Sequence, residues 1–134
     1  MKLNPYLTFG GNCREAFEFY KECLGGELKL TTVEQGGMAE QMPAKKDQIM
    51  HAELKSGEMT LMGSDMIMDG NVEPGNIVSI AITDGSKEEI EAVMNKIAEG
   101  GKIRAPFSET SFGYYGDLQD KYGFYWMFQS DKSE

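Results

Sequence analysis

Residues 77–101, IVSIAITDGSKEEIEAVMNKIAEGG, contain the strand, the helix start, the helix and the helix stop that decide the fold. The β-branched run at 77–83 predicts a strand. Ser86 with Glu89 has the spacing of a capping box, which starts a helix. Apolar residues then recur every three or four positions, as on one face of a helix, until Gly100 ends it.

The same plan occurs about 74 residues earlier, since residues 6–26 read YLTFGGNCREAFEFYKECLGG. Here Asn12 with Glu15 forms the capping pair, and a second Gly-Gly ends the helix. Each half continues with an extended segment and closes with a hairpin, which turns at 56–57 in the first half and around 122–123 in the second. We therefore predict an α+β fold of two βαβββ modules, about 1–64 and about 76–130, within a single domain 1–134.

Composition excludes several classes of partner. The chain has 134 residues and a net charge of −9, and its longest basic run is two lysines, so we expect no nucleic acid and no anionic membrane surface as partners. It has no apolar run of about 20 residues and no leader-like start, so we expect no membrane span. Cys13 and Cys23 would lie about 15 Å apart on one helix, too far for a disulfide. Free thiols are typical of a cytoplasmic protein.

Seven short blocks resemble the PhnB-like branch of the vicinal oxygen chelate superfamily, which includes glyoxalase I, extradiol dioxygenases, and bleomycin- and fosfomycin-resistance proteins. The blocks are PYLTF (5–9), NC (12–13), AFEFY (16–20), MHAEL (50–54), LMGSD (61–65), EGGK (99–102) and DKYGFYWM (120–127). The resemblance implies that the two modules pair into a cupped mixed sheet with the site on its concave side. It also implies a homodimer.

The resemblance further implies where metal-dependent relatives place their ligands, typically His, Gln and Glu. Carried over, these positions fall on Pro5, near Ile77 and on Met127. Proline and isoleucine offer no ligand atom, and a thioether does not suit a hard metal. Since the chain also has only one histidine, we predict no metal and no cofactor.

His51 and Glu53 are the candidate catalytic residues. They are two apart on a predicted strand and therefore share a face. They could act as a general acid/base pair or as two ligands of a relocated metal. The structural alternative is a hydrogen-bonded strand histidine beside a solvated glutamate.

The predicted hairpin gives this pair its neighbours. With a two-residue turn at 56–57, we expect Glu53 opposite Thr60 and His51 opposite Met62, all on the face toward the cup. The resemblance to metal-dependent relatives implies instead the opposite face, with Leu61 and Met127 pointing inward. The sequence leaves both faces open.

Residues 112–128 hold eight of the fourteen aromatic residues. They could form core and a dimer contact, or the wall of a pocket for a flat or apolar ligand. Our predicted pocket-lining residues are Thr8, Thr60, Met62, Tyr115, Tyr125, Trp126 and Met127.

Two functions remain open at this point. The first is a metal-independent small-molecule-binding protein of the glyoxalase/bleomycin-resistance type. The second is a lyase- or dioxygenase-like enzyme with a relocated acid/base or metal site at His51 and Glu53.

Overall fold

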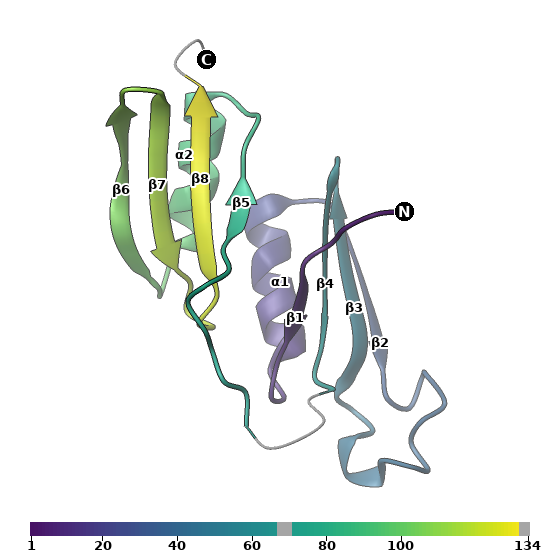
Figure 1. The fold of residues 1–134 in the computed structure, drawn as a ribbon. Coiled ribbons are helices and arrows are strands. Elements are labelled where there is room, and N and C mark those ends of the chain that lie inside the picture. The colour runs from purple at the N-terminus through teal and green to yellow at the C-terminus, as the bar shows by residue number, and fades with distance from the viewer. Residues whose placement is uncertain (67–70, 132–134) are drawn as a thin grey trace. The chain divides into compact units, whose positions relative to one another are not determined.

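The computed structural model describes residues 1–66 and 71–131. The chain divides into two compact units, residues 1–73 and 74–134. In the described residues each unit holds a four-stranded sheet and one α-helix (Figure 1). The α+β class and the two βαβββ modules are thereby confirmed. The prediction of a single domain over 1–134 stays a prediction.

Unit 1 follows the strand-helix-strand-strand-strand plan. Its elements are β1 (Tyr6–Thr8), α1 (Cys13–Leu24), β2 (Glu27–Thr32), the short 3₁₀ helix Pro43–Lys45, β3 (Ile49–Ser56) and β4 (Met59–Ser64). The sheet order is β1-β4-β3-β2, in which β1 is parallel to β4 and the other neighbours are antiparallel.

Helix α1 packs on one face of this sheet. Side chains alternate along a strand, so Ala52, Leu54 and Leu61 lie buried beneath the helix while their sequence neighbours lie on the other face. Gly63 is required by this packing, because a Cβ there would lie 2.6 Å from the Leu7 carbonyl oxygen. We call the face opposite the helix the open face of each sheet.

The start of α1 differs from the prediction. The Asn12 side chain makes no capping hydrogen bond. Asp65 caps the helix instead: its Oδ1 accepts hydrogen bonds from the backbone N–H groups of Gly11 (2.9 Å) and Cys13 (3.0 Å), and its Oδ2 from that of Ile49 (2.9 Å). This buried carboxylate therefore ties the helix to the start of β3.

The predicted register of the β3–β4 hairpin is wrong by two residues. Glu53 pairs with Met62 and Lys55 with Thr60, so the turn is made by residues 57–58. Gly57 has a φ of +60°, which favours glycine and suits a tight hairpin turn. A shift of two keeps every side chain on its face, so the predicted face of His51 and Glu53 is unchanged.

Unit 2 repeats the plan. Its elements are β5 (Ile80–Ile82), α2 (Lys87–Ile97), β6 (Lys102–Thr110), β7 (Gly113–Gln119) and β8 (Tyr125–Asp131), in the sheet order β5-β8-β7-β6. The predicted capping box is confirmed on its serine side, because Ser86 accepts a hydrogen bond from the N–H of Glu89 at 3.1 Å. Strand β5 is shorter than predicted, and Ile77 and Val78 before it are exposed.

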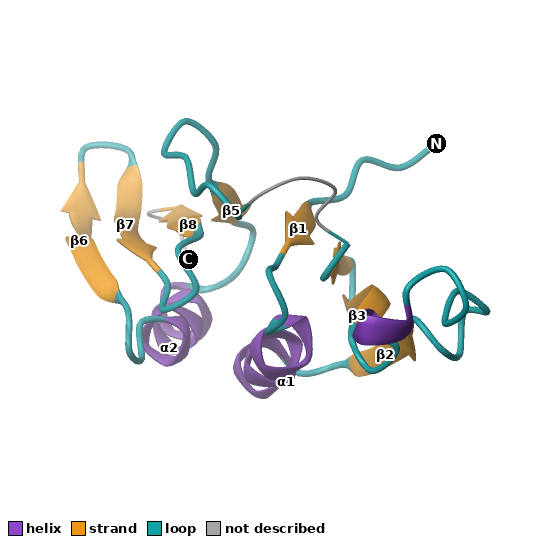
Figure 2. Cartoon of the chain, turned by 90° about the horizontal axis from the view of Figure 1, so that it is seen from below, coloured by secondary structure: helices purple, strands orange, loops and turns teal. Residues whose placement is uncertain are grey.

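Helix α2 covers one face of this sheet, as α1 does in its own unit (Figure 2). The core between helix and sheet contains Trp126, Phe128 and Leu118 from the strands and Met94 from the helix. The intervening residues of β7 and β8 lie on the open face. No helix within the described ranges is long and apolar enough to cross a membrane.

Candidate functional site

The two open faces carry acids at matching positions. Glu53 pairs with Met62 across β3 and β4, and Asp117 pairs with Met127 across β7 and β8. In both units a ring-bearing residue precedes the acid by two positions and so shares its face. The duplicated fold therefore presents a carboxylate, a ring and a methionine side by side in each unit.

In unit 2 these side chains form a connected cluster. The Tyr115 hydroxyl donates a hydrogen bond to Oδ2 of Asp117 at 2.7 Å. Nε of Arg104 lies 3.4 Å from Oδ1 of the same carboxylate, and the Arg104 guanidinium lies 4.9 Å from the centre of the Tyr125 ring. Three strands thus contribute to one cluster, which we call the Arg104 cluster: Arg104, Tyr115, Asp117 and Tyr125.

The contact between Arg104 and Asp117 is an ion pair without a directed hydrogen bond. Oδ1 of Asp117 is buried and has no hydrogen-bond partner among the described residues, although the guanidinium is within ion-pair distance. The side chain of Asp117 is 16% exposed and that of Arg104 is 49% exposed. The pair therefore presents its cation outward and its anion inward.

A β-bulge directs Arg104 to this face. Ile103 pairs with Leu118 and Ala105 pairs with Asp117, so Arg104 is the additional residue between two successive pairs. A bulge of this kind locally changes the direction of side chains on an edge strand. It lets the Arg104 side chain reach both Asp117 and Tyr125.

The Arg104 cluster also raises the pKa of one of its own members, Tyr115. The hydrogen bond to Asp117 raises the pKa of Tyr115; burial and the negative charge of Asp117 raise it further, while the positive charge of Arg104 lowers it. Tyr115 therefore stays a neutral hydrogen-bond donor at physiological pH.

The predicted acid/base pair in unit 1 shares a face, but its members have separate partners. The Tyr6 hydroxyl lies 3.4 Å from Nδ1 of His51, and their ring centres are 5.9 Å apart. Glu53 forms an ion pair with Lys55 at 3.5 Å. Among the described residues no hydrogen bond joins His51 to Glu53.

The predicted pocket residues fall into three groups. Thr60 and Met62 lie on the open face of unit 1, where Thr8 is exposed on the edge strand β1. Tyr115, Tyr125 and Met127 lie on the open face of unit 2. Trp126 lies on the opposite face, 1% exposed, and its Nε1 donates to Oδ2 of Asp120 at 2.8 Å.

Sequence reasoning missed Arg104 and Asp117. Asp117 could have been found, because it is two residues from Tyr115 on a strand and so shares its face. Arg104 could not, because simple alternation does not reveal a bulge.

The positions at which the family resemblance predicts metal ligands fall on Pro5, near Ile77 and on Met127. In residues 1–66 and 71–131 no three His, Cys, Asp or Glu side chains are placed to hold a metal ion together. Cys13 is fully buried, and burial raises the pKa of its thiol to about 12, with the charge of Asp65 adding to the shift.

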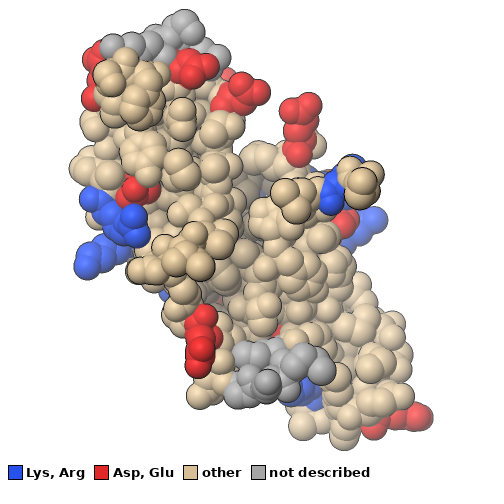
Figure 3. All heavy atoms as spheres, in the orientation of Figure 1, with Lys and Arg blue, Asp and Glu red and all other residues tan. Residues whose placement is uncertain are grey.

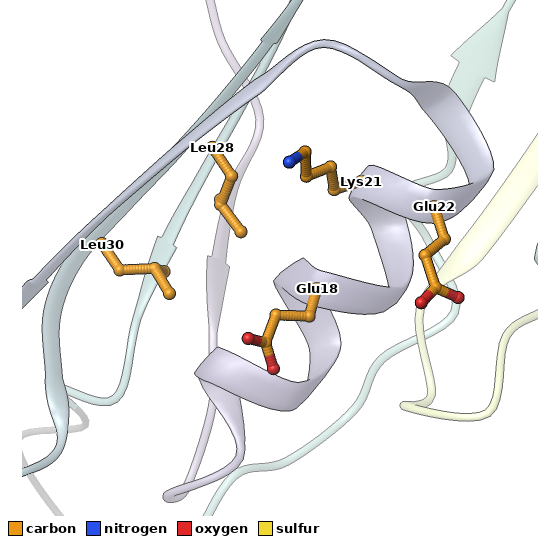
Figure 4. A pocket seen from close by; sticks show the side chains of 5 residues that line it. All are labelled: Glu18, Lys21, Glu22, Leu28 and Leu30. Atoms are coloured by element: carbon orange, nitrogen blue, oxygen red, sulfur yellow. The ribbon is translucent and has the colours of Figure 1, made fainter.

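A cavity of about 600 Å³ lies elsewhere in unit 1, between α1 and β2 (Figure 4). It is lined by Glu18, Lys21, Glu22, Leu28 and Leu30. Leu28 pairs with the buried Leu54, so the cavity is on the helix side of the sheet, opposite His51. None of the predicted site residues lines it.

Comparison with known proteins gives matches over nearly the whole chain. The family model described as 3-demethylubiquinone-9 3-methyltransferase matches residues 1–129. Protein YjdN of Escherichia coli (strain K12) is 30% identical over 146 residues, an alignment covering 100% of this chain and 98% of YjdN.

Two solved structures share the fold. Protein PA1353 from Pseudomonas aeruginosa is 36% identical with a TM-score of 0.85, covering 98% of each chain. A Bacillus cereus protein described as a putative 3-demethylubiquinone-9 3-methyltransferase, PhnB protein, is 26% identical with a TM-score of 0.75, covering 97% of this chain and 99% of that one. This chain therefore belongs to the 3-demethylubiquinone-9 3-methyltransferase family, the PhnB-like branch to which its sequence blocks pointed.

Proposed function

We propose that this protein binds a small organic ligand on the open faces of its sheets, without a metal ion at the positions that metal-dependent relatives use. The observation that carries the proposal is the Arg104 cluster. Exposed side chains on a sheet ordinarily move independently in water, whereas here Tyr115 and Arg104 both contact the Asp117 carboxylate, and Arg104 also lies over the ring of Tyr125 on a third strand. Fixed polar groups beside apolar side chains are typical of a ligand site.

The neighbouring side chains support the same function. Met127 pairs with Asp117, and Met62 occupies the matching position in unit 1. A methionine side chain is flexible and polarisable, so it adapts to ligands of different shape. The open face of unit 2 thus combines a fixed polar group with an adaptable apolar side chain, and unit 1 carries a methionine at the matching position.

Methyl transfer is named in the description of the family, but it is not the function we propose. The sequence has no glycine-rich motif of the kind that binds a methyl donor. The Arg104 cluster supports recognition of a ligand, and whether a bound ligand is converted is measured with the His51→Gln variant.

A second candidate is acid/base catalysis at His51. It is supported by the Tyr6 hydroxyl at 3.4 Å from Nδ1, a contact that would orient the imidazole ring. An imidazole suits proton transfer near neutral pH. Under this alternative Glu53 acts through its charge, since its contact is with Lys55.

The proposal is tested by NMR of protein labelled with ¹³C at the methionine methyl groups, titrated with a library of small organic fragments. We expect saturable shifts of the Met62 or Met127 signals. Met94, which is 1% exposed on the buried side of α2, is the internal control, and its signal should not shift. Ligands that shift neither Met62 nor Met127 would contradict the proposal. Conversion of a bound fragment that is lost in His51→Gln, while its binding persists, would establish the second candidate.

Metal content tests the metal-independent part of the proposal separately. We expect no stoichiometric first-row metal in protein dialysed without chelator. About one zinc, nickel or manganese ion per chain, lost in His51→Ala, would overturn the metal-independent proposal and indicate a relocated metal site.

A further inference from the structure

We propose that Arg104 binds the carboxylate group of a small aryl or alkyl monocarboxylate on the open face of unit 2. The inference deepens the proposed function, on which it rests, by naming the chemical class of the ligand. It follows from four features of the open face around Arg104: which guanidinium donors are used, which end of the ion pair is exposed, how much charge is present, and which apolar side chains adjoin the cluster.

The guanidinium is held in place with most of its donors unused. Nε faces Asp117, and Cζ lies 4.9 Å from the centre of the Tyr125 ring, so the guanidinium is held between two side chains of the protein. Arginine carries five N–H donors, four of them on the two terminal nitrogens. Among the described residues no hydrogen bond is made by these terminal nitrogens. Paired N–H groups match the two oxygens of a carboxylate, and because the side chain is already ordered, less rotamer entropy is lost on binding.

Exposure determines which end of the ion pair a ligand meets. Arg104 is 49% exposed, whereas Asp117 is 16% exposed and its Oδ1 is buried. Oδ2 of Asp117 already accepts the hydrogen bond from Tyr115. A ligand approaching the cluster therefore contacts the cation first. Figure 3 shows basic atoms at the side of unit 2 where β6 lies, on a surface with scattered acidic groups.

The charge of the cluster favours a monoanion over a dianion. Arg104 is already paired with one carboxylate, and the whole chain carries a net charge of −9, which repels multiply charged anions. Strand β6 contributes only one further basic residue, Lys102. One guanidinium fork matches one carboxylate, whereas a phosphate dianion would need additional cations.

An apolar body adjoins the expected position of the carboxylate. Met127 pairs with Asp117, and Tyr125 precedes it by two residues on the same face of β8. Benzoate combines a carboxylate with a flat apolar ring and is therefore the probe. Benzamide has the same shape without the charge, and phenyl phosphate has the ring with a larger anionic charge.

The test is an NMR titration of each probe into the methionine-labelled full chain and its variants. For benzoate we expect a saturable shift of Met127 and a dissociation constant that rises at least about tenfold in Arg104→Gln, equivalent to about 1.4 kcal/mol. Lys102→Gln is the matched control, since it removes one positive charge from the same strand, and it should change the constant less than about twofold. Arg104→Lys keeps the charge but loses the fork, so it should also weaken binding.

Four results would overturn the inference: unchanged benzoate affinity in both Arg104 variants, benzamide binding as tightly as benzoate, phenyl phosphate binding more tightly than benzoate, or no saturable Met127 shift with benzoate. In the last case, shifts of Met62 or Met127 by uncharged fragments would leave the proposed function standing. Failure of every fragment would refute both.

Discussion

Replacing Asp65 by asparagine should destabilise the protein strongly, although the two side chains have nearly the same shape. Asp65 is 2% exposed and accepts three backbone hydrogen bonds, from Gly11, Cys13 and Ile49. An amide has one oxygen and one NH₂ group. If its oxygen faces Gly11 and Cys13, its NH₂ faces the N–H of Ile49, and two donors then oppose each other without an acceptor.

The magnitude follows from those three bonds. A hydrogen bond to a charged acceptor contributes about 1.5–3 kcal/mol and a neutral one about 0.5–1.5 kcal/mol. One bond to a charged acceptor is lost, and the other two become neutral at a loss of roughly 1 kcal/mol each. The variant also loses the favourable interaction between the carboxylate charge and the N-terminus of α1. We expect the free energy of unfolding to fall by roughly 3–5 kcal/mol.

Urea unfolding followed by far-ultraviolet circular dichroism measures this change, with Asp47→Asn, an exposed position, as the matched control. Amide hydrogen exchange adds a local measurement, since exchange at Gly11, Cys13 or Ile49 should accelerate in the variant. A loss below about 1 kcal/mol, or unchanged exchange at all three amides, would refute the argument that this carboxylate holds α1 to β3.

Three further predictions concern ionisation and assembly. The thiol of Cys13 should not react with disulfide reagents at neutral pH until the protein unfolds, because burial raises its pKa to about 12. The protonated thiol contributes to the free energy of unfolding below pH 9, and this contribution is lost as the pH rises from 9 toward 12. Since the hydrogen bond to Asp117 raises the pKa of Tyr115, Asp117→Asn should move its alkaline titration down toward 10.0 when followed by NMR, and an unchanged titration would contradict that cause. Light scattering should give about twice the chain mass of 14.9 kDa, as the family resemblance implies for a homodimer, and a value near 15 kDa would contradict it.

Much of the fold could be predicted because its signals are local. The capping residues Ser86 and Glu89, the apolar helical stripes and the Gly-Gly stops depend on residues only a few positions apart, so they are visible in the sequence. Which residues of a strand share a face could be predicted for the same reason, whereas the sequence left open which of the two faces lies toward the site. Alternation along β3 put His51 and Glu53 on one face, and the error of two residues in the hairpin register left that face unchanged.

The candidate site was predicted only in part. Tyr115, Tyr125 and Met127 were identified from aromatic density and alternation, and the structure places them on one face. Trp126 was included with them, but it is next to both Tyr125 and Met127 in sequence, and alternation sends it to the helix side, where Asp120 accepts its Nε1 hydrogen bond. Arg104 was missed because its direction depends on a bulge opposite β7.

By itself, the sequence determined the two βαβββ modules and which residues of a strand share a face, since both depend on residue type or on spacing along the chain. The tertiary structure alone decided that Asp65, 52 residues after Cys13, caps α1, and that Arg104, Tyr115, Asp117 and Tyr125 meet on one face. The physical reason is that buried backbone donors and charged side chains take whichever partner packing brings within reach, and that partner can lie far away in the chain.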